Sequence, residues 1–132
     1  MSTAEPASDC LFCRIVAREV PADVVAETPR TLAFRDINPQ APTHVLVVPR
    51  EHHADVAALH AADPVLLADT IAAGVKIAED EGVAGTGYRL LFNTGVHAGQ
   101  TVFHAHLHVL GGEPLGALAG GALRTPGSAH PN

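Results

Sequence analysis

The sequence predicts a single α+β domain, built on a five-stranded, mainly antiparallel sheet with one long and one short helix. Five short stretches rich in Val, Leu, Ile, Phe and Tyr are separated by turn residues, so most strands are joined by short connections. One longer stretch, between Asp63 and Gly82, repeats its apolar residues at helical spacing. Strands joined by short turns, with one long helix over one face, are typical of the α+β class.

The short helix is predicted near the N-terminus. Asp9 is a suitable N-cap for a helix that runs through Leu11 and Ile15 towards Glu19, and Pro21 should end it. On such a helix Cys10 and Cys13 are three residues apart and share one face.

Three strands and a loop follow. Residues 24–26 and 31–34 flank a turn at 29–30 and predict a hairpin. Residues 36–43 contain two prolines, which exclude a ladder strand and predict an ordered loop. Residues 44–49 form a nearly continuous apolar run and predict the third strand.

The long helix has the clearest start and stop signals in the chain. Asp63 is a good N-cap, Pro64 suits the first helical position, and Gly82 is a natural stop. Its predicted apolar stripe consists of Leu67, Ile71, Val75 and Ala78.

Two further strands are predicted, at residues 88–92 and 100–110, on either side of a glycine-containing loop. In the second, His104, His106 and His108 alternate with apolar residues, so a strand would carry an imidazole face and an apolar face. A solvated edge strand is the unremarkable alternative. An open five-stranded sheet also leaves an edge that invites dimerisation.

Composition limits the classes of function. The chain has 132 residues, enough for one domain, and a formal net charge of −6, which does not suit binding of polymeric nucleic acid. We find no signal peptide and no apolar run approaching the ~20 residues of a membrane span, so we expect a cytoplasmic protein without membrane contact.

The three alternating histidines allow two kinds of chemistry. Neutral imidazoles can act as nucleophile and base towards phosphorus, or all three can bind zinc in a hydrolytic site. The preceding loop favours phosphorus, because its amide, hydroxyl and backbone N–H groups suit a phosphate. These donors belong to Asn93, Gly95, Gly99, Gln100 and Thr101.

The two cysteines form half of a zinc site. Cys10 and Cys13 have the spacing of zinc ligands, and His52 and His104 are available to complete the site. A redox pair and two ordinary buried cysteines remain alternatives. Asp36 follows a strand and could accept ribose hydroxyls or cap a turn, while His44 alone would be an ordinary core histidine.

The motifs resemble those of the histidine-triad family, named for the pattern His-x-His-x-His. Three stretches carry the resemblance, which runs from about Cys10 to Gly112 and is greatest to the zinc-containing bacterial type of the Hint-like nucleoside phosphoramidases. These stretches are residues 34–44, 87–93 and 99–112.

The resemblance implies a homodimer whose sheets join, with a site for a purine nucleoside monophosphate, its phosphoramidate or adenylate on each subunit. His106 matches the nucleophile that forms a nucleotidyl-histidine, and His44 matches a fourth, supporting histidine. The remaining matches are His108, Asn93, Gly99 and Thr101 for phosphate, and Asp36 with Ile37 for ribose and base. Structural zinc would be bound by Cys10, Cys13, His52 and His104.

The same resemblance leaves other functions open. A sister branch cleaves dinucleoside polyphosphates with the same triad, and a non-catalytic, zinc-stabilised nucleotide-binding module is a further alternative. The chain lacks the tryptophan-containing C-terminal segment of eukaryotic members, which bears on the leaving group. We predict a family domain at 9–112, a disordered tail at 1–8, and a flexible or partner-contacting tail at 113–132.

Overall fold

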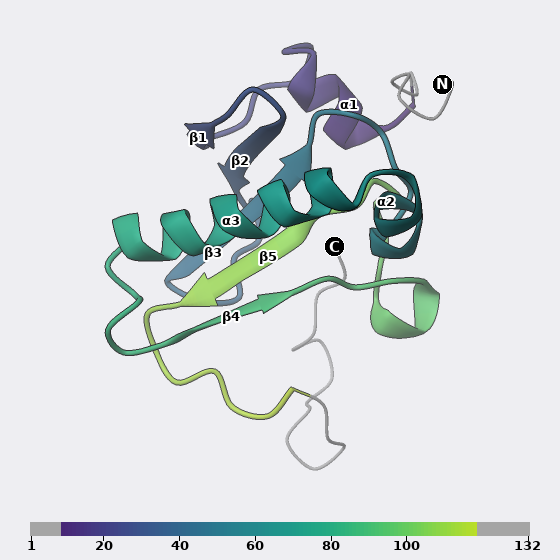
Figure 1. Ribbon diagram of the computed structural model, residues 1–132. Coiled ribbons are helices and arrows are strands. Elements are labelled where there is room, and N and C mark those ends of the chain that lie inside the picture. Colours follow the sequence, from purple (N-terminus) through teal and green to yellow (C-terminus); the bar gives the residue numbers. More distant parts are fainter. Residues whose placement is uncertain (1–8, 119–132) are drawn as a thin grey trace.

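The computed structural model describes residues 9–118, and shows one open sheet with a long helix across it (Figure 1). Residues 113–118 form neither helix nor strand, and the rest of the predicted tails, 1–8 and 119–132, lies outside the described residues. The helices are α1 (Leu11–Val16), α2 (Val56–Ala62) and α3 (Pro64–Asp80), and a 3-10 turn, η2, spans Val96–Ala98. The strands are β1 (Val24–Glu27), β2 (Thr31–Arg35), β3 (Thr43–Pro49), β4 (Tyr88–Leu91) and β5 (Leu107–Gly111).

The sheet has the order β1-β2-β3-β5-β4, and every neighbouring pair is antiparallel. The predicted five-stranded antiparallel sheet is therefore confirmed. Strands β3 and β5 lie at its centre, where Leu46 pairs with His108 and His44 pairs with Leu110. This register brings a histidine of β3 next to a histidine of β5.

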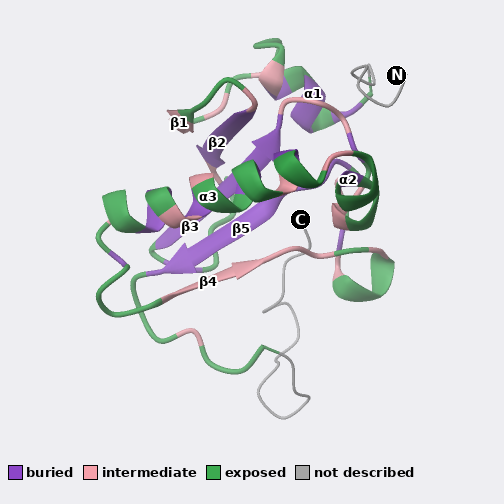
Figure 2. Ribbon diagram, viewed as in Figure 1, coloured by how far each residue is buried: buried purple, intermediate pink, exposed green. Residues whose placement is uncertain are grey.

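The two faces of the sheet bury different side chains. Alternating residues of β3 and β5, among them Val47 and Val109, pack under α3, as predicted. On the other face, Leu46 and Val48 pack with Phe12 of α1. Both central strands are buried along their whole length, whereas β4 at the edge is only half-buried (Figure 2).

Helix α3 begins as predicted but turns a different stripe towards the sheet. The Asp63 side chain accepts a hydrogen bond from the Leu66 backbone N–H at 3.0 Å, and Pro64 is the first helical residue. The buried positions are Leu66, Thr70, Gly74, Ile77 and Ala78. The predicted stripe was therefore shifted by about one residue, and only Ala78 belongs to both.

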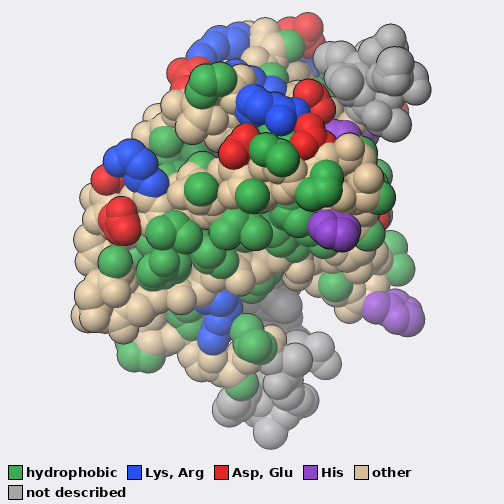
Figure 3. All heavy atoms as spheres, viewed as in Figure 1, with side chains coloured by type: hydrophobic (Ala, Val, Ile, Leu, Met, Phe, Trp, Pro, Cys, Tyr) green, Lys and Arg blue, Asp and Glu red, His purple; other side chains and the backbone are tan. Residues whose placement is uncertain are grey.

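Small residues explain the shift. A Cβ atom at position 74 would lie 2.6 Å from Cδ2 of Leu107, so glycine allows α3 to approach β5 closely. The apolar residues of the predicted stripe instead lie at the flank of the helix, where Ile71 is 39% exposed. Figure 3 shows hydrophobic side chains gathered on this side of the molecule, over α3 and towards β4.

The first two helices differ from the prediction. The cap of α1 is Cys10, not Asp9: its Sγ accepts the Cys13 backbone N–H at 3.4 Å, and the helix ends at Val16. Helix α2 was not predicted, although Asp55 caps it by accepting the Ala58 N–H at 2.8 Å. None of the helices in the part of the chain described is both long and apolar enough to cross a membrane.

The predicted histidine strand is shorter than expected. Only His108 lies in β5, while His104 and His106 precede it. The chain there leaves the ladder because the backbone N–H of Ala105 donates to the carbonyl of His53 at 2.7 Å instead. All three histidines are buried and β5 is central, so the solvated edge strand is excluded.

The close approach of α3 and β5 can be tested at position 74. We expect Gly74→Val to lower the free energy of unfolding by about 1–3 kcal/mol, because its side chain must displace the buried Leu107. Urea denaturation of this variant and of Ala72→Val, at an exposed position of the same helix, measures the difference. Equal losses in both variants would show that packing at position 74 is not the cause.

Candidate functional site

The histidines that alternate in the sequence lie in one buried layer between α1 and the end of the sheet. His106 is 2% exposed and its ring meets the edge of Phe12, with ring centroids 5.0 Å apart. The ring of His108 lies beside it at a centroid separation of 5.1 Å. Each ring has a polar contact that identifies which nitrogen carries its proton.

His106 is held by the backbone just before it. Its Nδ1 lies 2.7 Å from the carbonyl oxygen of His104. Since a carbonyl oxygen only accepts, Nδ1 carries the proton and donates it. In the neutral ring the lone pair is therefore on Nε2, which is the form of imidazole that can act as a nucleophile.

His108 has the opposite arrangement, which is imposed through His44. The backbone N–H of Gln40 donates to Nδ1 of His44 at 3.0 Å, so the proton of a neutral His44 is on Nε2. That Nε2 lies 2.9 Å from Nδ1 of His108 and donates to it. A neutral His108 then carries its own proton on Nε2 and can donate it to a ligand.

Asp36 lies beside this pair. Its Oδ2 is 3.4 Å from Nε2 of His44, and its Oδ1 accepts the Asn38 backbone N–H at 2.9 Å. The predicted turn-capping contact is thus present. Burial lowers the pKa of His44, and the neighbouring Asp36 carboxylate opposes that shift only in part.

The predicted metal ligands come together in space. The Nδ1 atom of His104 lies 3.5 Å from the Sγ atoms of both Cys10 and Cys13, and 3.3 Å from Nδ1 of His52. Sγ of Cys13 is also 3.3 Å from Nδ1 of His52. One ligand atom from each of the four residues lies within 4.8 Å of the others, so the cluster could hold a metal ion.

The protonation state of His104 suits a metal ligand. Its Nε2 donates to the carbonyl of Pro49 at 2.8 Å, which leaves the lone pair on Nδ1, facing the cysteines and His52. Burial lowers the pKa of His104 to about 4, so its ring is neutral at pH 7. Burial also lowers the pKa of His52. Both rings can therefore give a lone pair to a metal.

The three triad histidines do not share one ion. His104 faces the cysteine cluster, while His106 and His108 face other partners, so the arrangement contradicts a zinc hydrolase with all three as ligands. Asp36, His44 and His108 form a second compact group. A metal there would need a lone pair on Nε2 of His44, but the Gln40 N–H places the proton on that atom.

An apolar cavity of about 150 Å³ is lined by Phe12, whose ring contacts His106, and by Asp36, which lies beside His44. Ile37, Phe34 and Val102 also contribute to its walls. Asp36 is buried, whereas Ile37 is almost fully exposed. The cavity combines an aromatic and aliphatic lining with two charged residues, Asp36 and Arg35, and the Asp36 carboxylate suits a ring attached to a group that bears hydroxyls.

The predicted phosphate loop is ordered by one buried side chain. The amide of Gln100 accepts the Gly95 backbone N–H at 2.9 Å and donates to the carbonyls of Ala54 and Val102. Its polar atoms are thus used within the chain. Gly99 has a φ of 91°, a backbone conformation that glycine adopts easily, and this lets the loop turn towards Thr101. The side chain of Thr101 is exposed, and that of Asn93 is half-buried.

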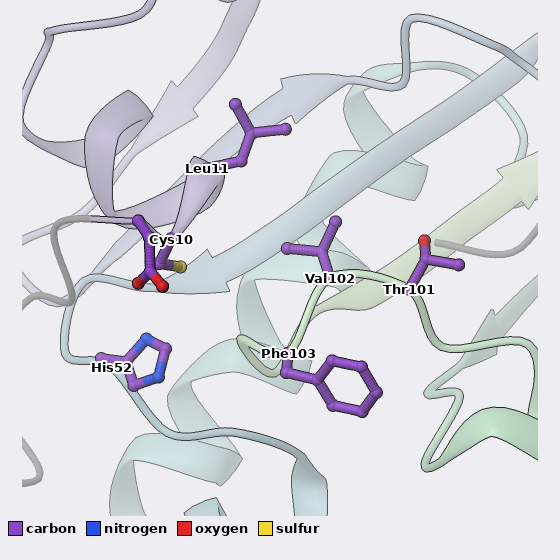
Figure 4. Close-up of a pocket in the computed structure, with 7 residues that line it drawn as sticks. Cys10, Leu11, His52, Thr101, Val102 and Phe103 are labelled. Atoms are coloured by element: carbon purple, nitrogen blue, oxygen red, sulfur yellow. The ribbon is translucent and has the colours of Figure 1, made fainter.

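A second cavity, of about 370 Å³, shares Leu11 and Val102 with the first, and Figure 4 shows the residues that line it. It extends from the outer side of the metal cluster to the end of the loop. Its walls are formed by Asp9, Cys10, Leu11, His52, Thr101, Val102 and Phe103.

The sequence analysis did not identify two contributors to the site. Phe12 was not singled out, because its contact with the ring of His106 becomes visible only in the folded chain. The Gln40 N–H is a backbone group four residues before His44, and its role follows only from the folded loop. His60 and His97 are exposed, as expected, and His130 lies outside the described residues.

Comparisons with known proteins agree with this arrangement. The HIT domain family matches residues 17–115. The purine nucleoside phosphoramidase of Escherichia coli K12 is 46% identical over 112 residues, which cover 85% of this chain and 94% of that protein. A HIT family hydrolase from Clostridium thermocellum is 48% identical with a TM-score of 0.80, covering 84% of this chain and 96% of that one. A HIT family hydrolase from Legionella pneumophila is 46% identical with a TM-score of 0.81, and the match covers 85% of this chain and 100% of that one. The chain therefore belongs to the histidine-triad, or HIT, domain family.

Proposed function

We propose that this protein is a nucleoside phosphoramidase, which cleaves the P–N bond of purine nucleoside phosphoramidates through a nucleotidyl-histidine intermediate. The observation that carries the proposal is the pair of adjacent rings with opposite tautomers. His106 has a lone pair on Nε2, and His108 has a proton on Nε2. Nucleophile and proton donor thus lie side by side. The similarity to the E. coli enzyme named purine nucleoside phosphoramidase supports the choice of substrate.

The proposed reaction has two steps. Nε2 of His106 bonds to phosphorus as the P–N bond breaks, and Nε2–H of His108 gives its proton to the departing nitrogen. Positive charge develops on the His106 ring as its Nε2 bonds to phosphorus, and the hydrogen bond from its Nδ1–H to the carbonyl of His104 stabilises that charge. Water then attacks phosphorus and returns a proton to His108. The nucleoside monophosphate leaves and His106 is restored.

The neighbouring groups support binding of a nucleotide at this place. In the proposed complex the nucleoside occupies the 150 Å³ cavity, where Asp36 accepts ribose hydroxyls and Ile37 contacts the base. The phosphate lies against the loop formed by Asn93, Gly99 and Thr101. Gln100 acts there indirectly, because its side chain holds the loop in shape.

We propose further that the cluster of two cysteines and two histidines binds structural zinc. A tetrahedral zinc ion with ordinary bond lengths places its nitrogen ligands about 3.3 Å apart, and sulfur and nitrogen about 3.5 Å apart. The corresponding distances here are 3.3 Å between Nδ1 of His52 and His104, and 3.5 Å between Sγ of Cys10 and Nδ1 of His104. The donor set and its spacing therefore fit zinc. Reduced thiols of this kind favour a cytoplasmic location.

A homodimer is the assembly that we propose. Strand β4 is the edge strand at one side of the sheet, and its residues are only half-buried. The flank of α3 beside it exposes Ile71, and Figure 3 shows the hydrophobic side chains gathered there. Joining two copies through β4 would pair this edge and cover the flank of both α3 helices.

Removal of the proposed nucleophile should abolish turnover. We expect His106→Ala to lower kcat/KM for a fluorogenic adenosine phosphoramidate by a factor of about 10³ or more. Acid quenching of the wild type during turnover should yield a protein heavier by one adenylyl group, which the variant lacks. His97→Ala, at an exposed histidine of η2, is the matched control. Equal rates for the wild type and His106→Ala, or no rate for either, would refute the proposed activity.

Removal of a proposed zinc ligand should release the metal. We expect Cys10→Ser to reduce bound zinc from about one ion per chain to near zero and to lower the melting temperature. Serine is itself a good N-cap, so the start of α1 is retained and the loss is due to the metal. Metal analysis after gel filtration measures the change, with His60→Ala as the control. Full zinc content in Cys10→Ser would show that the ligand set is wrong.

A charge on the exposed flank of α3 should separate the proposed dimer. Ile71→Glu would bury a carboxylate at the interface, so we expect the variant to sediment as a monomer at micromolar concentration, where the wild type sediments as a dimer. Val65→Glu changes another exposed apolar residue, on a different side of α3, and should leave the dimer intact. A dimer of undiminished affinity in Ile71→Glu would place the interface elsewhere.

A further inference from the structure

The 370 Å³ cavity has no role in the function proposed so far. It shares Leu11 and Val102 with the nucleoside cavity, so these two side chains form a wall between the two spaces. Figure 4 shows Cys10 and His52 on one side of it and Val102, Phe103 and Thr101 on the other. The cavity is thus a neighbour of the nucleoside site and opens next to the phosphate loop.

The position of Thr101 relates this cavity to the proposed reaction. Thr101 belongs to the loop that we assign to the phosphate, and it also lines the cavity. A phosphate at Thr101 has its nucleoside on one side of the Leu11–Val102 wall. The only other substituent on phosphorus that extends away from the site is the leaving group, and the space on the far side of that wall can receive it.

The lining of the cavity favours a cation. Asp9 contributes a carboxylate, and none of the described residues that line the cavity is a lysine or an arginine. Phe103 is 47% exposed and lines the cavity, so its aromatic ring is accessible to a ligand there. An ammonium group is attracted electrostatically to a nearby carboxylate and to the face of an aromatic ring. An uncharged alkyl chain has neither of these electrostatic attractions.

We propose that this cavity is the leaving-group site, and that it selects phosphoramidates whose departing amine carries a second, positively charged ammonium group. The inference rests on the proposed phosphoramidase activity and adds the class of leaving group to it. Asp9 and Phe103 are the residues that determine this specificity. The distal ammonium takes no part in bond making or breaking: the reacting nitrogen still receives its proton from His108.

Two substrates of equal length test the inference. One is the adenosine phosphoramidate of diaminobutane, which ends in an ammonium group, and the other is that of pentylamine, which ends in a methyl group. We expect wild-type kcat/KM to be roughly two- to fivefold higher for the charged substrate, the range that a partly exposed ion pair provides. This ratio should fall towards one as sodium chloride is raised to about 0.5 M, because salt screens the attraction.

Variants then assign the preference to the cavity. Asp9→Asn should bring the ratio of kcat/KM for the two substrates to about one, and Asp9→Lys should bring it below one. Glu79→Gln removes the same charge from an exposed position near the end of α3 and should retain the wild-type ratio. Phe103→Leu, which keeps apolar bulk but removes the aromatic face, should lower the ratio. Zinc content measured on each variant excludes loss of the metal next to Asp9 as the cause.

The outcomes distinguish the two proposals. If the wild type cleaves neither substrate, the phosphoramidase activity is refuted and the leaving-group site falls with it. If the wild type cleaves both, but the ratio is one or is the same in Asp9→Asn as in the wild type, the activity stands and the leaving-group site is refuted. A preference that is lost in Asp9→Asn and retained in Glu79→Gln supports both.

Discussion

The chemistry of this site depends on hydrogen bonds between the backbone and imidazole rings. The carbonyl of His104 places the proton of His106 on Nδ1, and the N–H of Gln40 places the proton of His44 on Nε2. A neutral imidazole has one donor and one acceptor nitrogen, so fixing one nitrogen determines the other. The chain thereby places opposite tautomers on His106 and His108, which are chemically identical and two positions apart, and the proposed nucleophile and proton donor need this difference.

These contacts require the central pair of strands. Strand β3 carries His44 and β5 carries His108, and their antiparallel register brings the two rings to 2.9 Å. A slip of one residue would move His108 to the face under α3, away from His44. That face is closed by the helix, which Gly74 allows to lie close to Leu107. The packing of α3 on one face of the sheet thus stabilises the β3–β5 register, and the contact between His44 and His108 on the other face requires that register.

The sequence predicted the parts of this protein that follow from local periodicity or from a motif. The five strands, the start of α3 and the Cys10–Cys13 pair belong to this group. The buried stripe of α3 was misjudged because hydrophobicity ranks Ile71 above Gly74, whereas close packing on β5 needs the smaller residue. Helix α2 was missed because its alanine-rich turns give almost no apolar periodicity.

The tautomers could not be predicted from the sequence, since they depend on backbone groups that approach only in the folded chain. The carbonyl that orients His104 comes from Pro49, which lies 55 positions away in the sequence. An alternating histidine pattern therefore identifies which residues take part, but it does not assign a separate role to each of them. The proposed division of the triad into metal ligand, nucleophile and proton donor follows from contacts that only the folded chain provides.

His104 connects the proposed zinc site to the proposed nucleophile within one residue. Its Nδ1 faces the cysteines, its Nε2 donates to the carbonyl of Pro49, and its own carbonyl oxygen accepts a hydrogen bond from Nδ1–H of His106. A metal bound at Nδ1 would hold the ring, and with it the backbone whose carbonyl sets the tautomer of His106. Structural zinc and catalysis are then linked without any contact between the metal and the substrate. Among residues 9–118, His104 has both its ring and its carbonyl placed to provide that link, and it is the first histidine of the triad.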